Sequence, residues 1–512
     1  MPILAVFIGV TLPWLNPFSP GPTSAAGPFM FAWLCAAGVL LALAFDRQQG
    51  QHECMVRAIA MAWLSAAALS ALIGLLQYFG ATASFGVWLN HTGIGEAYGN
   101  LRQRNQFATL LNIGQMALLG LVANAGRSPA DWRTRPGQHW KFALGLTLAT
   151  LLGIGNAASS SRTGLLQLLL LAALVLWWQR GAVRASTRAQ LVMLAMLLAY
   201  AAASLALPLL AGLDPLNSGA WARLRAGDAA CTSRLTLWRN VLHLIELKPW
   251  LGWGWGELDY AHFITLYPGE RFCDILDNAH NLPLHLAIEL GIPFAVLACG
   301  LALLLVWLGR PWREAEPSRQ MAWGILAVIG LHSLLEYPLW YGPFQIAALL
   351  CIWLLWWLPK SGAPIQIHKS FRPPAQYSKA LAAIIITAFV GFATWNYHLA
   401  SQIYLAPEAR DSAYQSDTLA KIRHIWLFQD QVRFADLTTS ELTASNATAL
   451  HALALEMLHF SPEARVVEWV LDSALLLGHA DEVAFFAERM RAAFPKDYAA
   501  WAKANPAAAL PK

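Results

Sequence analysis

The stretch DNAHNLPLHLAIELGIP, residues 277–293, places a histidine where a polar run meets a long apolar segment. The ordinary pKa of an imidazole lies near neutral pH, so His280 at a water-accessible edge suits general base catalysis. A single histidine is also commonly a structural hydrogen-bonding residue. A third alternative is a metal site with Asp274 and Asp277, although this spacing is too common to be specific. Asn281 follows His280 directly and belongs to the same candidate site.

Three short polar stretches interrupt the apolar sequence: LRQRNQFATLL, SSSRTGLLQ and HSLLEYPLWYGPF. They contain the candidate site residues Gln103, Arg104, Asn105, Arg162, Glu336 and Tyr337. The first stretch predicts either an interfacial helix cap or an anion site made from guanidinium groups and a helix N-terminus. Arg162 lies in a turn with almost no loop, so a phosphate partner competes evenly with a structural role. The simplest interpretation of the third stretch is an interfacial aromatic anchor.

A fourth polar stretch, TSRLTLWRNVLHLIELKPWLGWGWG, carries Arg234 and Arg239. Its spacing predicts an amphipathic helix that lies on the membrane and ends at the Lys-Pro pair. An interfacial aromatic belt explains the tryptophans of GWGWG better than sugar stacking does. Arg234 close to Arg162 would suit a diphosphate, because a guanidinium binds phosphate bidentately and stays charged.

Composition identifies the elements that must position these residues. Of the 512 residues 57% are hydrophobic and 13% are charged, about half the charge of an ordinary soluble domain. The apolar runs are long and continuous, which favours membrane helices over the alternating strands of an outer-membrane barrel. The sequence therefore predicts an all-α polytopic membrane protein. We expect the first helix to be retained as an anchor, because it lacks the basic region and cleavage site of a signal peptide.

Apolar runs predict eleven membrane spans, and the charges of the loops between them orient the chain. The spans are 1–15, 28–45, 58–79, 106–124, 141–157, 164–179, 189–212, 282–308, 321–335, 344–358 and 379–398. Five alternate loops hold 16 Lys or Arg, whereas the short loops of the opposite set hold only Arg102, Arg104 and Arg162. Cytoplasmic loops retain the positive excess, so we predict a cytoplasmic N-terminus. The loop 213–281 and the C-terminal tail then lie outside, in the periplasm of a bacterium, and the candidate residues share that face.

The tail, residues 399–512, differs in composition from the rest of the chain. It holds 14 acidic and 10 basic residues and has no apolar run long enough to span a membrane. Apolar residues at helical spacing around a central Gly suggest helical hairpins of the tetratricopeptide kind, although one and a half units are weak evidence for a repeat. We predict a transmembrane catalytic domain over 1–398, including the periplasmic loop, and a periplasmic helical domain over 399–512.

Six cysteines are distributed over spans and loops. Cys231 and Cys273 both fall in the loop 213–281, which is the one oxidising compartment that the predicted topology offers. A disulfide between them is therefore plausible, and free thiols are the equally weighted alternative. The cysteines inside spans are expected to be small buried hydrophobic residues.

Taken together, the quoted motifs resemble the bacterial O-linked protein oligosaccharyltransferases that glycosylate pilins, within the superfamily of O-antigen ligases and polymerases. The resemblance runs in order from about residue 100 to 345, and the tail resembles the C-terminal domain of the protein-glycosylating branch. It implies a GT-C-like inner-membrane enzyme that moves a glycan en bloc from undecaprenyl diphosphate to a Ser or Thr hydroxyl of a periplasmic protein. It implies no cofactor, no metal and no nucleic-acid partner.

The resemblance also implies roles for individual residues. His280 matches the family's essential loop histidine, and Arg162 and Arg234 match arginines that hold the lipid diphosphate. Gln103 and Tyr337 match polar positions required in the protein-glycosylating members. The sequence departs from the family at Arg104, where a proline is frequent. Catalysis is thus expected from His280, Arg234, Arg162 and Tyr337, and substrate binding from Gln103, Arg104, Asn105, Asn281, Glu336 and Arg239.

Three alternatives remain at the level of sequence. The acceptor of the same chemistry could be lipid A-core, as in an O-antigen ligase, or a growing glycan, as in a polymerase. A lipid-linked sugar flippase or another transporter is less favoured, since transporters place polar sites near the bilayer midplane and within internal repeats. A purely structural membrane scaffold would leave the clustering of polar residues at one face unexplained.

Overall fold

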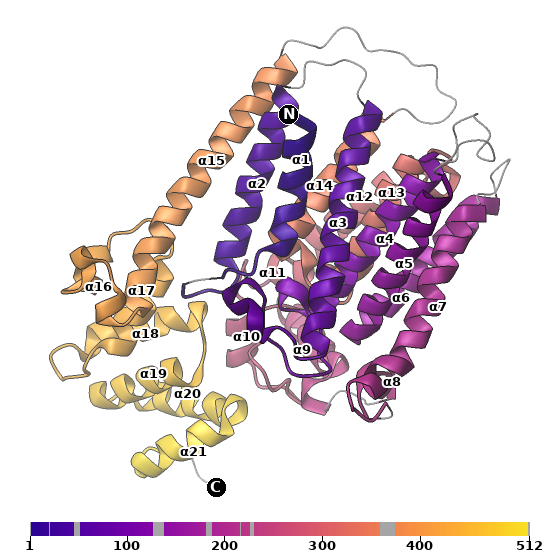
Figure 1. Cartoon of the computed structure of the whole chain (residues 1–512). Helices are drawn as coiled ribbons and strands as arrows, with labels where there is room; N and C mark the ends of the chain where they lie inside the picture. Colours follow the sequence, from indigo (N-terminus) through magenta and orange to yellow (C-terminus); the bar gives the residue numbers. More distant parts are fainter. Residues whose placement is uncertain are drawn as a thin grey trace. The chain divides into compact units, whose positions relative to one another are not determined.

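The computed structural model describes residues 2–19, 21–45, 52–125, 138–180, 187–215, 217–225, 230–358 and 374–509. Over these ranges every regular element is a helix (Figure 1). The predicted all-α class is therefore confirmed. Short 3₁₀ helices cover Ala83–Trp88, Gly99–Leu101, Ala230–Thr232, Pro311–Arg313, Pro338–Trp340, Gln402–Tyr404, Pro407–Ala409 and Ser412–Tyr414.

Each of the eleven predicted spans coincides with helical structure. The helices are α1 (Pro2–Leu15), α2 (Ala26–Ala44), α3 (His52–Tyr78), α4 (Arg104–Ala125), α5 (Gln138–Ser159), α6 (Arg162–Arg180), α7 (Thr187–Leu210), α12 (Ile292–Gly309), α13 (Pro317–Ser333), α14 (Gly342–Trp357) and α15 (Pro374–Ser401). Among the described residues, eight helices are long and apolar enough to cross a membrane, and α1 and α14 are shorter apolar helices. The protein is a multi-pass membrane protein.

One predicted span, 282–308, is wrong in its continuity. The chain forms a separate nine-residue helix, α11 (Leu282–Leu290), and starts α12 only after a break at Gly291. Gly291 has a φ of 87° and a ψ of 160°, and a Cβ there would lie 2.1 Å from the carbonyl oxygen of Trp250. Hydropathy does not reveal this break, because it depends on a close approach between two segments distant in sequence.

Internal contacts divide the chain into two compact units. Unit one contains Met1–Ala226 and Leu305–Phe392, and unit two contains Gly227–Leu304 and Ala393–Lys512. Most of the large loop between α7 and α11 thus groups with the tail. The domain limits predicted from the sequence remain a prediction.

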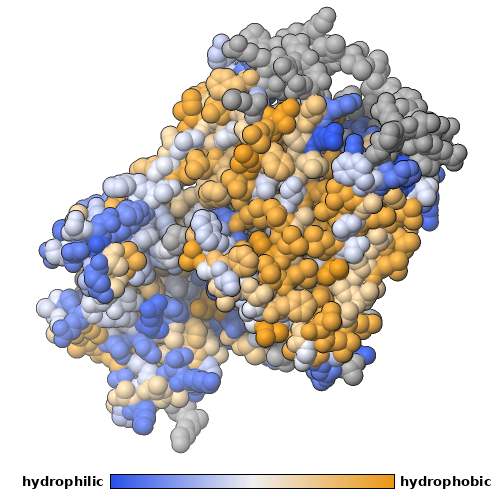
Figure 2. Space-filling model, in the orientation of Figure 1, coloured by the Kyte–Doolittle hydropathy of each residue, from blue (hydrophilic) through white to orange (hydrophobic). Residues whose placement is uncertain are grey.

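Unit one is a bundle in which α4 is the most enclosed helix. Its residues from Gln106 to Gly120 are all buried, and α4 packs against α3, α5, α6 and α13. Small residues permit this close packing, since a Cβ on Gly114 would lie 2.2 Å from the Cβ of Ala67 in α3. Hydrophobic side chains dominate the visible surface of these helices (Figure 2). The short helix α8 (Gly219–Arg225) also belongs to this unit.

Unit two combines the loop helices with the helices of the tail. The former are α9 (Arg234–Leu247), α10 (Leu258–Ile264) and α11, and the latter are α16 (Thr418–Ile422), α17 (Gln429–Thr439), α18 (Ala447–Phe460), α19 (Ala464–Leu477), α20 (Ala480–Ala493) and α21 (Pro495–Ala504). Phe263 of α10 belongs to the same hydrophobic cluster as Val470 and Met490 of the tail. Hydrophilic residues are plentiful on the visible surface of the tail (Figure 2).

Candidate functional site

His280 occupies a backbone conformation that few non-glycine residues adopt. Its φ is 49°, and its N–H donates to Oδ1 of Asn278 across 2.9 Å. Asn281 then caps α11, because its side-chain oxygen accepts the N–H of Leu284 at 3.1 Å. Side chains on both sides of His280 thus hold the left-handed turn, and they present a half-buried imidazole at the start of a helix.

The helix that carries Arg234 is tied to the His280 turn. Ser233 caps α9 by accepting the N–H of Thr236 at 3.1 Å, so Arg234 is the first helical residue. Trp238, one turn later, donates from Nε1 to the carbonyl oxygen of Ala279 across 3.1 Å. Within unit two, Arg234 and His280 therefore lie on elements joined by a hydrogen bond. Arg239 is exposed on the same helix.

The apolar face of α9 packs inside the protein. Leu237, Val241 and Leu244 are fully buried and share a cluster with residues of α10 and α11, whereas Leu235 and Leu242 are exposed. The predicted helix is confirmed, and it ends at Lys248 as expected. Its position on a membrane surface remains a prediction that the exposed leucines favour.

The GWGWG turn packs against the end of α11 through its backbone. The N–H groups of Trp253 and Gly254 donate to the carbonyls of Ile288 and Glu289 across 2.8 and 3.0 Å. The N–H of Gly256 donates to Oε2 of Glu289 at 3.0 Å. Glu289 and its neighbour His285, 3.6 Å apart, are almost fully buried. The sequence alone suggested no role for Glu289. In the structure its carboxylate holds the GWGWG turn in place.

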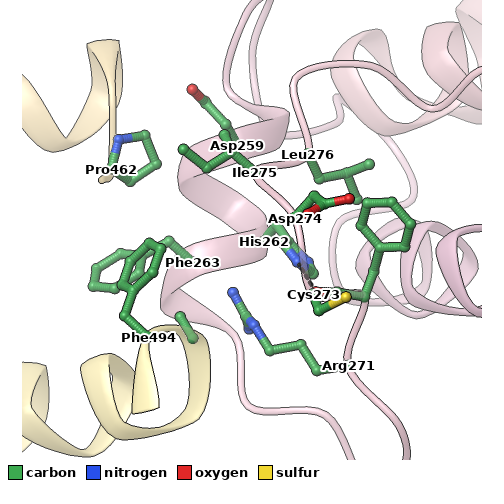
Figure 3. Close-up of a pocket in the computed structure, with 12 residues that line it drawn as sticks. Asp259, His262, Phe263, Arg271, Cys273, Asp274, Ile275, Leu276, Pro462 and Phe494 are labelled. Atoms are coloured by element: carbon green, nitrogen blue, oxygen red, sulfur yellow. Dashed lines mark hydrogen bonds between the residues drawn. The ribbon is translucent and has the colours of Figure 1, made fainter. Parts of the chain in front are cut away.

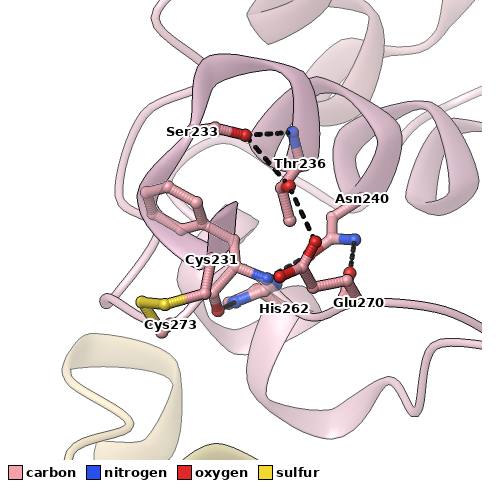
Figure 4. Close-up of a disulfide and its surroundings, with 8 residues drawn as sticks. Cys231, Ser233, Thr236, Asn240, His262, Glu270 and Cys273 are labelled. Atoms are coloured by element: carbon pink, nitrogen blue, oxygen red, sulfur yellow. Dashed lines mark hydrogen bonds between the residues drawn. A yellow bond between two sulfur atoms is a disulfide. The ribbon is translucent and has the colours of Figure 1, made fainter. Parts of the chain in front are cut away.

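Cys231 and Cys273 form a disulfide in the structure, with Cα atoms 5.4 Å apart (Figure 4). The same figure shows Asn240 of α9, which is buried, beside Glu270 of the loop. Its Nδ2 donates to the carbonyl of Glu270 at 3.0 Å, and its Oδ1 accepts the N–H of Phe272 at 2.7 Å. Covalent and hydrogen bonds therefore hold the segment before His280 against α9.

A small pocket in unit two lies where α10 and the segment around Cys273 meet the tail (Figure 3). Burial raises the pKa of Asp259 to about 7 and lowers the pKa of His262 to about 3. Both ring nitrogens of His262 have partners, namely the Tyr267 hydroxyl at 2.8 Å and the Phe272 carbonyl at 3.1 Å. His262 is thus a neutral structural residue, and sequence reasoning had not singled it out.

In unit one, three elements converge on Asn105. Its Nδ2 donates to Oε1 of the buried Glu336 across 3.1 Å, and its Oδ1 accepts the hydroxyl of Ser161 at 2.6 Å. The Ser161 oxygen also accepts the N–H of Gly164 at 2.9 Å and so caps α6, whose first residue is Arg162. Asn105 therefore joins the start of α4 to the start of α6 and to the turn before α14.

Arg104 and Gln103 have local roles at the start of α4. The Arg104 guanidinium lies 3.1 Å from Oε1 of Glu96, donates to the hydroxyl of Tyr98 at 3.1 Å and sits over its ring. Gln103 accepts the N–H of Gln106 at 2.6 Å through its side chain and so caps the helix. Loop residues thus already engage the Arg104 side chain, and its predicted contact with substrate stays a prediction.

A second small pocket, in unit one, brings three predicted residues together. It is lined by Gln103, Gln106, His332, Glu336, Tyr337, Pro338 and Tyr341. The Tyr337 ring stacks on Tyr341, with centroids 5.9 Å apart. His332 was missed from the sequence, although it opens the HSLLEYPLW motif. Its Nδ1 lies 2.9 Å from the Thr109 hydroxyl, and its Nε2 is buried without a hydrogen-bond partner among the described residues.

Two groups of predicted residues are thus brought together, each inside one unit: Gln103, Asn105, Glu336 and Tyr337 in unit one, and Arg234, His280 and Asn281 in unit two. Asp274, Asp277 and His280 do not bring three ligand atoms within 4.8 Å of one another in the described part of the chain. The predicted common face, which requires Arg162 of unit one beside His280 of unit two, draws on both units and remains a prediction.

Segments of the chain match three sequence families. Residues 97–121 match the family described as protein glycosylation ligase, and residues 146–299 match O-antigen ligase. Residues 320–509 match the family described as virulence factor membrane-bound polymerase, C-terminal.

Two curated proteins of Acinetobacter baylyi are similar to this chain. A general O-oligosaccharyltransferase is 26% identical over 158 residues, which is 31% of this chain and 27% of the relative. A ComP-specific O-oligosaccharyltransferase is 23% identical over 321 residues, 62% of this chain and 54% of the relative. The chain spans about half the length of the second relative and less of the first. No solved structure matches it significantly. This multi-pass membrane protein is therefore homologous to O-oligosaccharyltransferases, and segments of it match the O-antigen ligase and protein glycosylation ligase families.

Proposed function

We propose that the protein transfers a glycan en bloc from undecaprenyl diphosphate to a Ser or Thr hydroxyl of a periplasmic protein such as pilin. One observation carries this proposal: the segment that matches O-antigen ligase, residues 146–299, contains Arg162, Arg234 and His280. The segment that matches protein glycosylation ligase adds Gln103. Both relatives are named as O-oligosaccharyltransferases.

In the proposed reaction His280 is the general base. It takes the proton of the acceptor hydroxyl, whose oxygen then forms a bond to the anomeric carbon of the glycan. The bond from that carbon to the lipid diphosphate breaks, and the electron pair leaves with the diphosphate. This direct displacement inverts the anomeric configuration and uses no metal. The capped, left-handed turn around His280 supports the proposal, because it holds the imidazole at a helix start.

Arg162 and Arg234 stabilise the leaving group. Negative charge grows on the bridging oxygen as the diphosphate departs, and guanidinium groups aimed at it lower the barrier. Each arginine is the first residue of a helix whose serine cap is fully formed. A helix N-terminus adds a favourable field for an anion. These features support an anion-binding role for both residues.

The pocket around Gln103 and Tyr337 binds substrate in this proposal, and Asn105 and Glu336 position its walls. Asn281, Arg104 and Arg239 also bind substrate in this proposal. Loop charges favour an inner-membrane protein with a cytoplasmic N-terminus and a periplasmic tail. The disulfide supports the same orientation, since disulfides persist in the oxidising periplasm.

The test is transfer in cells that flip a lipid-linked glycan and express a pilin. We expect the intact mass of the pilin to rise by the mass of one glycan with the wild-type protein. With His280→Ala the mass should stay that of the unglycosylated pilin. His424→Ala, which alters an exposed histidine of the tail, is the matched control and should transfer normally. Unmodified pilin with the wild-type protein, alongside glycan on lipid A-core, would replace this proposal with the ligase alternative.

Donor titration with purified protein tests the arginines separately. Arg162→Ala and Arg234→Ala should raise the KM for the lipid-linked donor and lower kcat, while the Lys variants should recover only part of the activity because the planar fork is lost. If an Ala variant and the wild type transferred at equal rates at every donor concentration, the substituted arginine would not bind the diphosphate.

A further inference from the structure

A second group of ligand-type side chains lies in the tail, apart from the residues of the proposed transferase chemistry. His451 belongs to α18, His479 directly precedes α20, and Glu482 lies in the first turn of α20. Each offers one ligand atom, and these atoms all lie within 4.8 Å of one another. Oε2 of Glu482 is 2.8 Å from Nε2 of His451 and 3.3 Å from Nδ1 of His479.

The tautomer of His451 follows from its contact with Ser473. The buried Ser473 hydroxyl has two backbone carbonyls as acceptors for its only proton, that of Trp469 at 2.5 Å and that of Val470 at 3.1 Å. Its oxygen, 3.0 Å from Nδ1 of His451, must therefore accept a proton from that nitrogen. In the neutral ring Nε2 then carries a bare lone pair. Metal-binding histidines are held in this way, with the other ring nitrogen donating to the protein.

The bare nitrogen is turned toward a carboxylate. Nε2 of His451 is buried and forms no hydrogen bond within the described residues, yet it faces Oε2 of Glu482 at 2.8 Å. Two acceptors at this distance repel each other unless a proton or a metal cation lies between or beside them. The two imidazole rings lie at an angle of 79° to each other, and one nitrogen of each ring lies within 3.3 Å of the same carboxylate oxygen. Donor atoms around a tetrahedral Zn²⁺ with bonds of about 2.1 Å lie ~3.4 Å apart. The distance from His479 to Glu482, 3.3 Å, is close to this spacing, whereas the 2.8 Å between His451 and Glu482 would have to lengthen when a metal binds.

We propose that His451, His479 and Glu482 bind a divalent transition metal of the Zn²⁺ type. Two imidazoles and one carboxylate form a ligand set that Zn²⁺ favours over Mg²⁺ or Ca²⁺, which prefer oxygen alone. His479 and Glu482 are about half exposed, at 47% and 43%, so solvent supplies the fourth ligand. The metal crosslinks α18 to the turn between α19 and α20 and stabilises the tail.

The turn geometry supports this placement. Gly478 ends α19 with a φ of 75°, and the N–H of His479 returns to the carbonyl of Ala474 at 2.9 Å. The chain then enters α20 with His479 and Glu482 three residues apart, and both contact each other beside His451 of α18. The proposal concerns the stability of the tail and does not depend on the transferase reaction.

The test uses the full-length protein in detergent, with any affinity tag removed and metals stripped by a chelator. Zn²⁺ alone is then added. We expect one equivalent to bind and to raise the thermal unfolding temperature of the wild-type protein. Co²⁺ should give the visible absorption bands of a tetrahedral site. His479→Ala and Glu482→Gln alter half-exposed side chains, so both variants should fold and bind Zn²⁺ about tenfold or more weakly.

His398→Ala is the matched control. His398 is also about half exposed and pairs with one carboxylate, Asp411, at 2.8 Å, and this variant should bind Zn²⁺ as the wild type does. Equal Zn²⁺ affinity in wild type and His479→Ala would overturn the proposal. So would a wild-type protein whose unfolding temperature responds to pH but not to Zn²⁺, since a proton would then fill the place of the metal.

Discussion

The indole Nε1 of Trp238 donates a hydrogen bond to the carbonyl oxygen of Ala279 across 3.1 Å. This bond joins the helix that begins with Arg234 to the residue directly before His280. The backbone at His280 has a φ of 49°, a conformation that is maintained only when its surroundings enforce it. Trp238 is therefore a positioning residue for the proposed base.

Trp238→Phe should lower kcat for glycan transfer while changing the donor KM little. The substitution keeps an aromatic six-membered ring but removes the N–H donor, and the lost hydrogen bond costs about 0.5–1.5 kcal/mol of stability. The His280 turn then relaxes in part. Transfer kinetics and thermal unfolding of the same preparation measure the two effects. Trp250→Phe, at a side chain that is 75% exposed, is the control. Identical kcat in both variants would contradict the positioning role.

Asn105 and Glu336 should couple strongly in a double-mutant cycle. Asn105→Asp replaces the amide donor with a second carboxylate 3.1 Å from the buried Glu336, so we expect a loss of about 1–3 kcal/mol in stability and a marked loss of activity. Adding Glu336→Gln restores the hydrogen bond with the roles exchanged, because the amide introduced at position 336 then donates to the carboxylate introduced at position 105.

The combined variant should therefore be more stable than Asn105→Asp alone, as measured by thermal unfolding of each protein in the same detergent. Glu336→Gln by itself should be the mildest change, since the amide of Gln keeps an oxygen for Asn105. Additive losses in the combined variant would show that the bond at 3.1 Å contributes no coupling.

The Cys231–Cys273 disulfide should stabilise unit two by about 4 kcal/mol. The bond joins residues 42 positions apart, and closing a loop of this length removes about that much chain entropy from the unfolded state. Reductant should lower the unfolding temperature of the wild type to that of the Cys231→Ser, Cys273→Ser protein and leave the latter unchanged. A non-reducing peptide map that finds both thiols free in protein from the periplasm would contradict the bond.

The sequence predicted the helices of the membrane part well because each is a long apolar run, a property of local composition. It did not predict the break at Gly291, which depends on the approach of Trp250. Nor did it predict the bond between Asn105 and Glu336, 231 positions apart. A short motif is enough to identify Asn105 or Glu336 as a candidate, but the sequence does not show which residue of another segment each one contacts. Phe263, in the loop, packs in the core of the tail, a contact that no periodicity indicates.

The pH dependence of unit two should contain opposite contributions from two groups in the pocket of Figure 3. Burial, with the carboxylates of Glu257 and Asp277 adding to it, raises the pKa of Asp259 to about 7. The folded state therefore binds more protons than the unfolded state between about pH 4 and 7, and this contribution to stability is lost as the pH rises. The lowered pKa of His262, about 3, contributes stability at neutral pH that is lost on acidification.

Asp259→Asn removes only the first contribution. The unfolding temperature of the variant should therefore rise relative to that of the wild type as the pH increases from 4 to 7, measured by tryptophan fluorescence. Asp274→Asn, at an exposed carboxylate that lines the same pocket, is the control. A difference between variant and wild type that does not change with pH would show that Asp259 titrates alike in the folded and unfolded protein.

Gly291→Ala should strongly destabilise unit two and abolish transfer, although it adds one methyl group. The φ of 87° and ψ of 160° lie in a region that is essentially restricted to glycine and costs other residues about 1–3 kcal/mol. The new Cβ would also lie 2.1 Å from the Trp250 carbonyl, which belongs to rigid backbone. To relieve that clash, α11 must move away from the GWGWG turn, and the His280 turn moves with it.

Gly300→Ala is the matched control in the adjoining helix α12, where a Cβ meets nothing within 4 Å. Alanine is favoured over glycine inside a helix by about 1 kcal/mol, so this variant should be as stable as the wild type or more so. Thermal unfolding and pilin glycosylation of the two variants measure the contrast. If Gly291→Ala retained wild-type transfer, the break at Gly291 would not be needed to hold His280 in place.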